Sequence, residues 1–255
     1  LAPRDGTVIS IIGVGLSLEQ ALGLNPSFQA DLREFGWLGS VSSSNQVTVV
    51  WHGSPVKSLD DARRVVTQLG SSGAGSVSQQ YPAFYNAFLG TKFKIVYGYP
   101  GSPQINLAME RGELDGAGSN GWAQSLIETP HYVREKWITP LIQTGLRKEP
   151  DLPDTPLLLD LARNEEERAA FRFMSNAVEF GRPVATPAGA PAERLAALRE
   201  AFEKTVRDPA FLDDVRRAGA DARPANGAAI EKIVRDLIEA PEALRARVKT
   251  AIGGG

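Results

Sequence analysis

The residue types that most often carry catalysis are few in this chain and stand apart from one another. The 255 residues include two histidines but no cysteine, which excludes disulfides, thiol catalysis and cysteine metal sites. His52 precedes a Gly-Ser-Pro turn and His131 follows a proline, and neither lies at metal-ligand spacing from another histidine. We interpret both as surface or capping residues, and we predict no catalytic residue and no metal site.

One glycine motif resembles a dinucleotide-binding fingerprint. Residues 116–121 read Gly-Ala-Gly-Ser-Asn-Gly and match the pattern Gly-x-Gly-x-x-Gly. Such a site needs a long buried strand before it and a full helix after it. Here the preceding residues 112–115 are short and polar, and the following helix ends by Thr129. We therefore predict no NAD and no other cofactor, and we interpret the segment as a loop that binds another ligand.

Three other segments share a composition that favours anion binding. Each follows an apolar run, contains glycine, has no Lys or Arg and leads into a helical pattern: Gly13 to Ser17, Gly70 to Ser76 and Gly98 to Ser102. Glycine lets backbone N–H groups approach a ligand closely, and a helix N-terminus adds unpaired N–H groups and a positive dipole end. Taken singly, each segment is as well explained as an ordinary strand-to-helix turn. Together, the three predict a site that holds a carboxylate or phosphate without a cationic side chain.

These loops require strands and helices on either side, and the hydrophobic pattern supplies both. Strands alternate with helices in the first part of the chain, and helices dominate later, which favours a parallel or mixed sheet covered by helices. Strands are expected at Val8–Ile12 (buried), Phe35–Val41, Gln46–Trp51, Phe93–Tyr97, Trp137–Gln143 and Pro183–Thr186. Helices are expected at 17–22, 58–69, 76–89, 102–111, 157–162, 165–178, 192–207, 209–218, 226–238 and 241–251.

An ordered series of short motifs resembles the periplasmic receptors of tripartite tricarboxylate transporters, the Bug-type solute-binding proteins. The resembling segments are Pro3 to Thr7, Lys57 to Leu59, Ser71 to Ser76, Tyr99 to Ser102, Arg111 to Gly116, Pro150 to Pro156 and Ala185 to Pro191. No single motif is specific, but the series runs in order over essentially the whole chain. The chain also departs from the family, because the family's first strand-helix units have no counterpart before Leu1, which suggests that an N-terminal segment is missing.

The resemblance implies a two-lobe α/β fold of periplasmic-binding-protein type (type II), with mixed sheets flanked by helices and a ligand cleft between the lobes. Transferred here, lobe 1 is 1–46 with 183–255 and lobe 2 is 47–182. The loops and the resemblance together predict these ligand-binding residues: Gly13, Val14, Gly15, Leu16, Ser72, Gly73, Ala74, Gly75, Ser76, Tyr99, Pro100, Gly101, Ser102, Ser119, Asn120 and Trp122. Many family members carry an acidic residue near the place of Trp122. The tryptophan predicts an aromatic pocket wall and puts the usual small dicarboxylate ligand in question.

The function that follows is capture of a small carboxylated metabolite, in the periplasm, by a monomer that delivers it to membrane permease subunits. With 28 Lys and Arg against 30 Asp and Glu, the net charge of −2 gives no reason to expect a nucleic-acid partner. Two alternatives remain: an enzyme on a similar two-lobe fold, and a sensor that signals ligand binding to a partner. The enzyme ranks behind, because Ser, Tyr and Asn occur in the predicted loops without a paired His or Lys.

Overall fold

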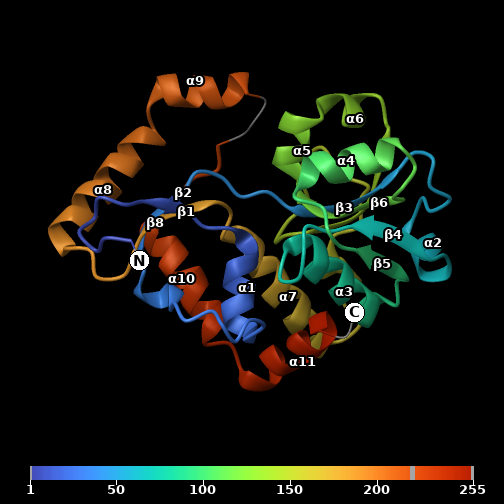
Figure 1. Cartoon of the computed structure of the whole chain (residues 1–255), viewed down its shortest axis with the longest axis horizontal. Coiled ribbons are helices and arrows are strands. Elements are labelled where there is room, and N and C mark those ends of the chain that lie inside the picture. Colours follow the sequence, from blue (N-terminus) through green and yellow to red (C-terminus); the bar gives the residue numbers. More distant parts are fainter. Residues whose placement is uncertain (1, 219–221, 254–255) are drawn as a thin grey trace. The chain divides into compact units, whose positions relative to one another are not determined.

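The computed structural model describes residues 2–218 and 222–253, which form two compact units (Figure 1). The described residues up to Ser44, with Asn176–Ala240, form the first unit. Asn45–Ser175 and the described residues from Pro241 onward form the second. None of the described helices is long and apolar enough to span a membrane.

The first unit contains a small antiparallel sheet with the strand order β1-β8-β2-β9. Its strands are β1 (Ser10–Ile11), β8 (Pro183–Thr186), β2 (Gly36–Ser40) and β9 (Ala225–Asn226). The helical segments are α1 (Val14–Leu22), η1 (Leu32–Glu34), α8 (Ala192–Thr205), α9 (Pro209–Arg217) and α10 (Gly227–Ile238). Helix α10 buries Ile230, Val234 and Leu237, which recur at helical spacing and therefore form one apolar stripe.

Trp37 is the centre of the first unit's core. It packs with Phe180 and the α10 stripe, and its ring meets that of Phe180 edge to face at 5.2 Å. The indole N–H donates to the Leu32 carbonyl at 2.9 Å, which satisfies the one polar group of this buried side chain.

The second unit is built on a five-stranded mixed sheet with the order β5-β4-β6-β3-β7. The strands are β3 (Gln46–Trp51), β4 (Thr67–Gly70), β5 (Phe93–Val96), β6 (Gly116–Gly121) and β7 (Ile138–Thr144). Strands β5, β4 and β6 are parallel, and β3 runs antiparallel between β6 and β7. The carboxyl ends of three consecutive parallel strands therefore lie along one edge of the sheet.

Helices cover both faces of this sheet, as Figure 1 shows. One face packs against α4 (Ser102–Glu110), α5 (Trp122–Glu128) and α6 (Pro130–Arg134), whose Ile105, Met109, Trp122 and Tyr132 share a core with Val47 and Val49. The other face packs against α3 (Val77–Leu89). A side chain at Gly118 would meet the Ser78 carbonyl at 2.1 Å, so glycine at this position of β6 lets the first turn of α3 lie on the strand.

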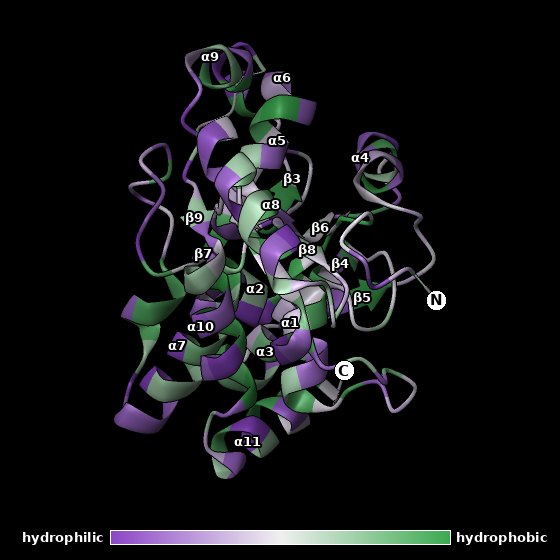
Figure 2. Ribbon diagram, turned by 90° about the vertical axis from the view of Figure 1, so that its left-hand side faces the viewer, coloured by the Kyte–Doolittle hydropathy of each residue, from purple (hydrophilic) through white to green (hydrophobic). Residues whose placement is uncertain are grey.

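The remaining helical segments of this unit are α2 (Leu59–Arg64), η2 (Leu158–Leu161), α7 (Glu165–Glu179) and α11 (Glu242–Gly253). The last turn of α7, from Asn176, belongs to the first unit. Figure 2 shows hydrophilic and hydrophobic segments interleaved along α7 and α11, as expected for helices that bury one face. Helix α11 packs on α3 and buries Val248 and Ile252.

The structure differs from the sequence expectations in several places. The first strand is exposed rather than buried: β1 is a two-residue edge strand, and Ile9 and Ile11 are 53% and 66% exposed. The helix expected over 58–69 ends at Arg64, because the β-branched residues that follow lead into β4. Residues 116–121 form strand β6 rather than a loop. The C-terminal helix, which we placed with the first lobe, packs within the second unit.

Candidate functional site

Three of the predicted ligand segments lie along the strand-end edge of the second unit. Residues 71–76 follow β4, residues 97–101 follow β5, and Ser119 and Asn120 belong to the last part of β6. In open α/β sheets this edge is where ligands bind. Contact of Gly118 with Ser78 brings the end of β6 against the start of α3, so the first and third segments are neighbours.

The backbone N–H groups of the loop from Ser71 to Ser78 divide into those with a hydrogen-bond acceptor and those without one. Five of its backbone N–H groups already have acceptors: Ser71 bonds Val96 O, Ser72 bonds Ser78 Oγ, Gly73 bonds Ser71 Oγ, Gly75 bonds Gln79 Oε1 and Ser76 bonds Gly73 O. Within this described loop, the structure shows no acceptor for the N–H groups of Ala74, Val77 and Ser78. These three are the unpaired N–H groups of the loop.

Helices without an N-terminal side-chain cap offer further unpaired backbone N–H groups. Helices α1, α3 and α4 begin after Gly13, Ser76 and Gly101, and none of these receives a side-chain cap. Helices α2, α9 and α10 are capped by Ser58, Asp208 and Asn226, whereas α5, α6 and α8 also lack a side-chain cap. Unpaired N–H groups and the positive end of the dipole therefore remain at the helices that follow the predicted loops.

The serine hydroxyls of the loop bond mainly to one another. Ser76 Oγ donates to Gly73 O at 2.7 Å and lies 2.9 Å from Ser78 Oγ and 3.2 Å from Ser71 Oγ. Ser71 and Ser78 are buried. The hydroxyl cluster therefore stiffens the loop, and direct contact with a ligand is better served by the free N–H groups.

The strand-end edge carries no side chain suited to acid–base chemistry or to metal binding. Residues 71–78, 97–104 and 116–122 contain no Asp, Glu, His, Lys or Arg. Among the described residues, no cluster of His, Asp and Glu is arranged to hold a metal ion. Nearby, burial raises the pKa of the Tyr85 phenol, which lies 2.6 Å from Thr144 Oγ1, so it stays neutral. The edge can therefore bind an anion through neutral donors alone.

Known structures with this architecture are solute-binding proteins. The periplasmic binding protein BugD shares 18% identity over 99% of this chain and 80% of its own, with a TM-score of 0.72. MatC from Rhodopseudomonas palustris, solved with malate, shares 17% over 97% and 81%, with a TM-score of 0.72. An R. palustris protein solved with adipate shares 18% over 99% and 80%, with a TM-score of 0.68. The chain has the periplasmic solute-binding fold. No protein-family model matches the chain, and no curated protein matches its sequence.

The predicted resemblance to Bug-type proteins is thus confirmed at the level of the fold. Gly13 to Leu16 lie in the first unit of the solute-binding fold, where Gly13 is the N-cap of α1 and the other three residues form its first turn. Ser17 is not the cap that the sequence suggested, because the helix begins at Val14 and Ser17 Oγ donates back to Val14 O at 2.8 Å. That these residues contact ligand stays a prediction.

Trp122 is a core residue rather than a pocket wall. It is 2% exposed and packs with the α4 and β3 side chains, although its indole N–H is buried without an acceptor. The neighbouring glycines suggested an open loop, but burying the large indole ring removes much apolar surface from water, and this favours a core position. Tyr99 is half-buried and packs against the same core. The argument from Trp122 against a small dicarboxylate therefore fails.

Sequence reasoning missed three glutamines that touch the predicted segments. Gln46 Oε1 accepts from Ser119 Oγ at 3.2 Å, while Asn120 Nδ2 donates to Ser125 Oγ at 3.3 Å. Gln79 and Gln80 bond the N–H and the carbonyl of Gly75. For Gln79 and Gln80, the signal in the sequence was two adjacent side-chain amides near the start of a mostly apolar helix.

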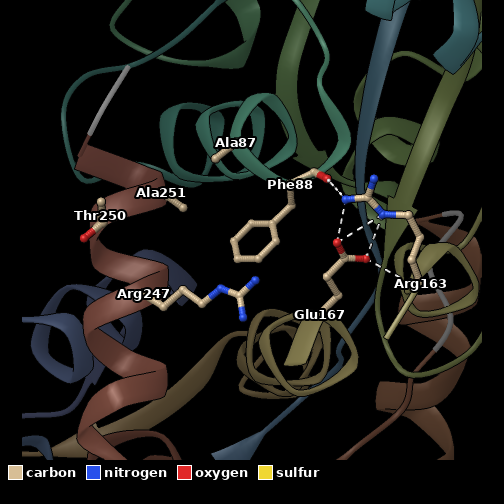
Figure 3. Close-up of a pocket in the computed structure, with 7 residues that line it drawn as sticks. All are labelled: Ala87, Phe88, Arg163, Glu167, Arg247, Thr250 and Ala251. Atoms are coloured by element: carbon tan, nitrogen blue, oxygen red, sulfur yellow. Dashed lines mark hydrogen bonds and ion pairs between the residues drawn. The ribbon is translucent and has the colours of Figure 1, made fainter. Parts of the chain in front are cut away.

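A cavity of about 420 Å³ lies elsewhere in the second unit, among α3, α7 and α11 (Figure 3). None of the predicted ligand residues lines it. Its charged groups are paired with acidic neighbours: Arg163 bonds Glu167 at 2.5 Å, and Arg247 pairs with Glu166 while stacking over Phe88 at 5.3 Å. A ligand there would compete with existing ion pairs, so the strand-end edge is the better candidate.

Proposed function

We propose that this chain is a solute-binding receptor that captures a small organic carboxylate and does not transform it. The observation that carries the proposal is the set of unpaired N–H groups of Ala74, Val77 and Ser78 at the strand-end edge, where no cationic side chain competes for the anion. Backbone N–H groups at a helix start recognise carboxylates well. Gly73 to Ser76 position these donors, and Tyr99 to Ser102 add those of α4.

The ligand class follows from the same geometry and from the fold. Malate and adipate, seen in two proteins of this fold, are dicarboxylates of four and six carbons. A dicarboxylate places one carboxylate on the α3 donors and leaves the second for another anchor, for which the Ser119–Asn120 pair is our candidate within the same unit. We further propose membership of the Bug-type family, a periplasmic location, a monomeric state and delivery to the permease subunits of a tripartite tricarboxylate transporter.

An enzyme on the same fold is the runner-up, and the site chemistry speaks against it. Catalysis at the strand ends would need a nucleophile with a base, or an acid–base pair, within reach of the ligand. The segments that form the edge hold serines, most of them hydrogen-bonded to one another, and no ionisable group other than tyrosine. A sensor that reports ligand binding to a signalling partner uses the same site, and the identity of neighbouring genes separates it from a transport receptor.

Calorimetric titration of the protein with malate and adipate tests the proposal, with the neutral diamide of malate as the matched control. The receptor is expected to bind at least one diacid and to ignore the diamide, because the N–H groups select the anion. Mass spectrometry of the mixture should recover the acid unchanged, with or without chelator and nicotinamide nucleotides. Equal binding of the diamide contradicts the anion site, and turnover above a buffer control moves the enzyme reading to the front.

A further inference from the structure

Gly75 is held from both sides by two consecutive side chains of α3. Its N–H donates to Gln79 Oε1 at 3.3 Å, and its carbonyl accepts from Gln80 Nε2 at 2.9 Å. Both glutamines are buried, with exposed fractions of 7% and 0%. The peptide planes before and after Gly75, which adopts a φ of +78°, therefore cannot rotate without breaking a hydrogen bond to a buried glutamine.

The orientation of the Gln79 amide is itself fixed by the C-terminal helix. Gln79 Nε2 donates to the Ile252 carbonyl of α11 at 3.0 Å, while its Oε1 faces Gly75. One end of the amide must accept and the other must donate, which a glutamine satisfies and a glutamate does not. Helix α11 thereby helps to set the position of this loop, through a hydrogen bond between two residues that lie 173 positions apart in the sequence.

Gln80 gains little stability from its burial. Its Oε1 is buried with no donor in the described structure, and an unsatisfied buried acceptor opposes folding. The contact it does make, to the Gly75 carbonyl, aims the following peptide and the first turn of α3. This combination is expected of a side chain that serves the site more than the stability of the core.

We propose that Gln79 and Gln80 are positioning residues of the anion site, which clamp Gly75 so that the N–H groups of Ala74 and Val77 point at the ligand, with α11 supporting the clamp through Ile252. This proposal rests on the proposed function and names residues outside the predicted ligand set. Neither glutamine touches the ligand; each acts through the backbone of the loop.

The experiment compares Gln79→Met and Gln80→Met with Gln68→Met, a control at an exposed position of β4 in the same unit. The clamp predicts that both test variants bind malate about three- to tenfold more weakly, the effect of losing a hydrogen bond that orients donors. Gln80→Met should melt no lower than the unchanged protein, because it also removes an unsatisfied acceptor. A lower melting temperature with unchanged affinity would show a merely structural role and overturn the proposal.

A second measurement separates the clamp from the ligand assignment. In the amide NMR spectrum of the ligand-free protein, the signals of Ala74 to Val77 should move in both test variants and stay in place in Gln68→Met. Signals that do not move overturn the clamp, whatever the protein binds. Signals that move in a protein that binds neither malate nor adipate support the clamp and count against the proposed ligand class.

Discussion

Gly75 adopts a backbone conformation that side chains rarely tolerate, at the centre of the loop proposed to hold the ligand. Its φ of +78° has a close match at Gly90, with φ +71°, at the other end of the same helix. Gly75→Ala and Gly90→Ala should each lower the free energy of unfolding by about 1–2 kcal/mol, the cost of a left-handed alanine. Only Gly75→Ala should also weaken ligand binding, because it disturbs the α3 donors.

Urea unfolding and calorimetry of the two variants check this pair. A loss of affinity in Gly90→Ala equal to that in Gly75→Ala would mean that strain at either end of α3 impairs binding. That result would contradict a specific role of the loop in binding the ligand.

Trp122 tests whether the strand ends bind ligand without an aromatic wall. Because Trp122 is a core residue, Trp122→Ala should lower the free energy of unfolding by about 3–5 kcal/mol. Trp122→Phe should cost less, since it removes the unpaired indole N–H along with part of the ring. Variants that remain folded should bind malate normally. Strongly reduced affinity with an unchanged melting temperature would show that Trp122 contacts the ligand and would contradict its assignment to the core.

At the scale of single elements, the buried Glu167 of α7 pairs with Arg163, an exposed residue just before the helix, and this ion pair gives a clear pH signature. Hydrogen bonds from Arg163 hold the pKa of Glu167 below its usual value of 4.5. A depressed pKa in the folded state stabilises the protein above the unfolded value, and that contribution is lost as the pH falls through the folded value. The difference in unfolding free energy between the protein and Glu167→Gln should therefore be largest near neutrality and shrink below about pH 4.5.

Urea unfolding at several pH values between about 3 and 7 measures this difference. Glu165→Gln is the matched control, because Glu165 lies on the same turn and its side chain is 89% exposed. A constant difference across the pH range would mean that Glu167 does not titrate differently in the folded state.

Local patterns were sufficient to predict most of the helices and strands, although α6, β4 and β9 were missed. Ser58 is the cap of α2 as its position before two aspartates indicates, and Asn226 and Asp208 start helices where the pattern places them. The clearest failure is strand β6. Strand β6 is rich in glycine and polar residues, and it is a strand because β3 and β4 pair with it on either side. Tertiary pairing of this kind has no local signature.

At the scale of the whole molecule, the positions of the loops could be predicted from the sequence. Which of their N–H groups form hydrogen bonds could not. Glycine content and the absence of Lys and Arg predict anion-binding loops at Gly70 to Ser76 and Gly98 to Ser102, and their contact with a ligand stays a prediction. Which N–H groups remain free depends on partners distant in sequence, such as Val96 for Ser71. The clamp on Gly75 likewise needs Ile252, whose helix the sequence assigned to the other lobe.

The central claim is that a carboxylate is held by the free N–H groups at the start of α3. Amide NMR of the whole protein, titrated with malate and then adipate, measures this most directly. We predict that the signals of Ala74, Val77 and Ser78 move downfield together with one dissociation constant, while those of Phe88, Arg163 and Arg247 at the α3–α7–α11 cavity stay in place. Saturable shifts confined to that cavity, or binding that leaves the α3 signals unmoved, would contradict the account.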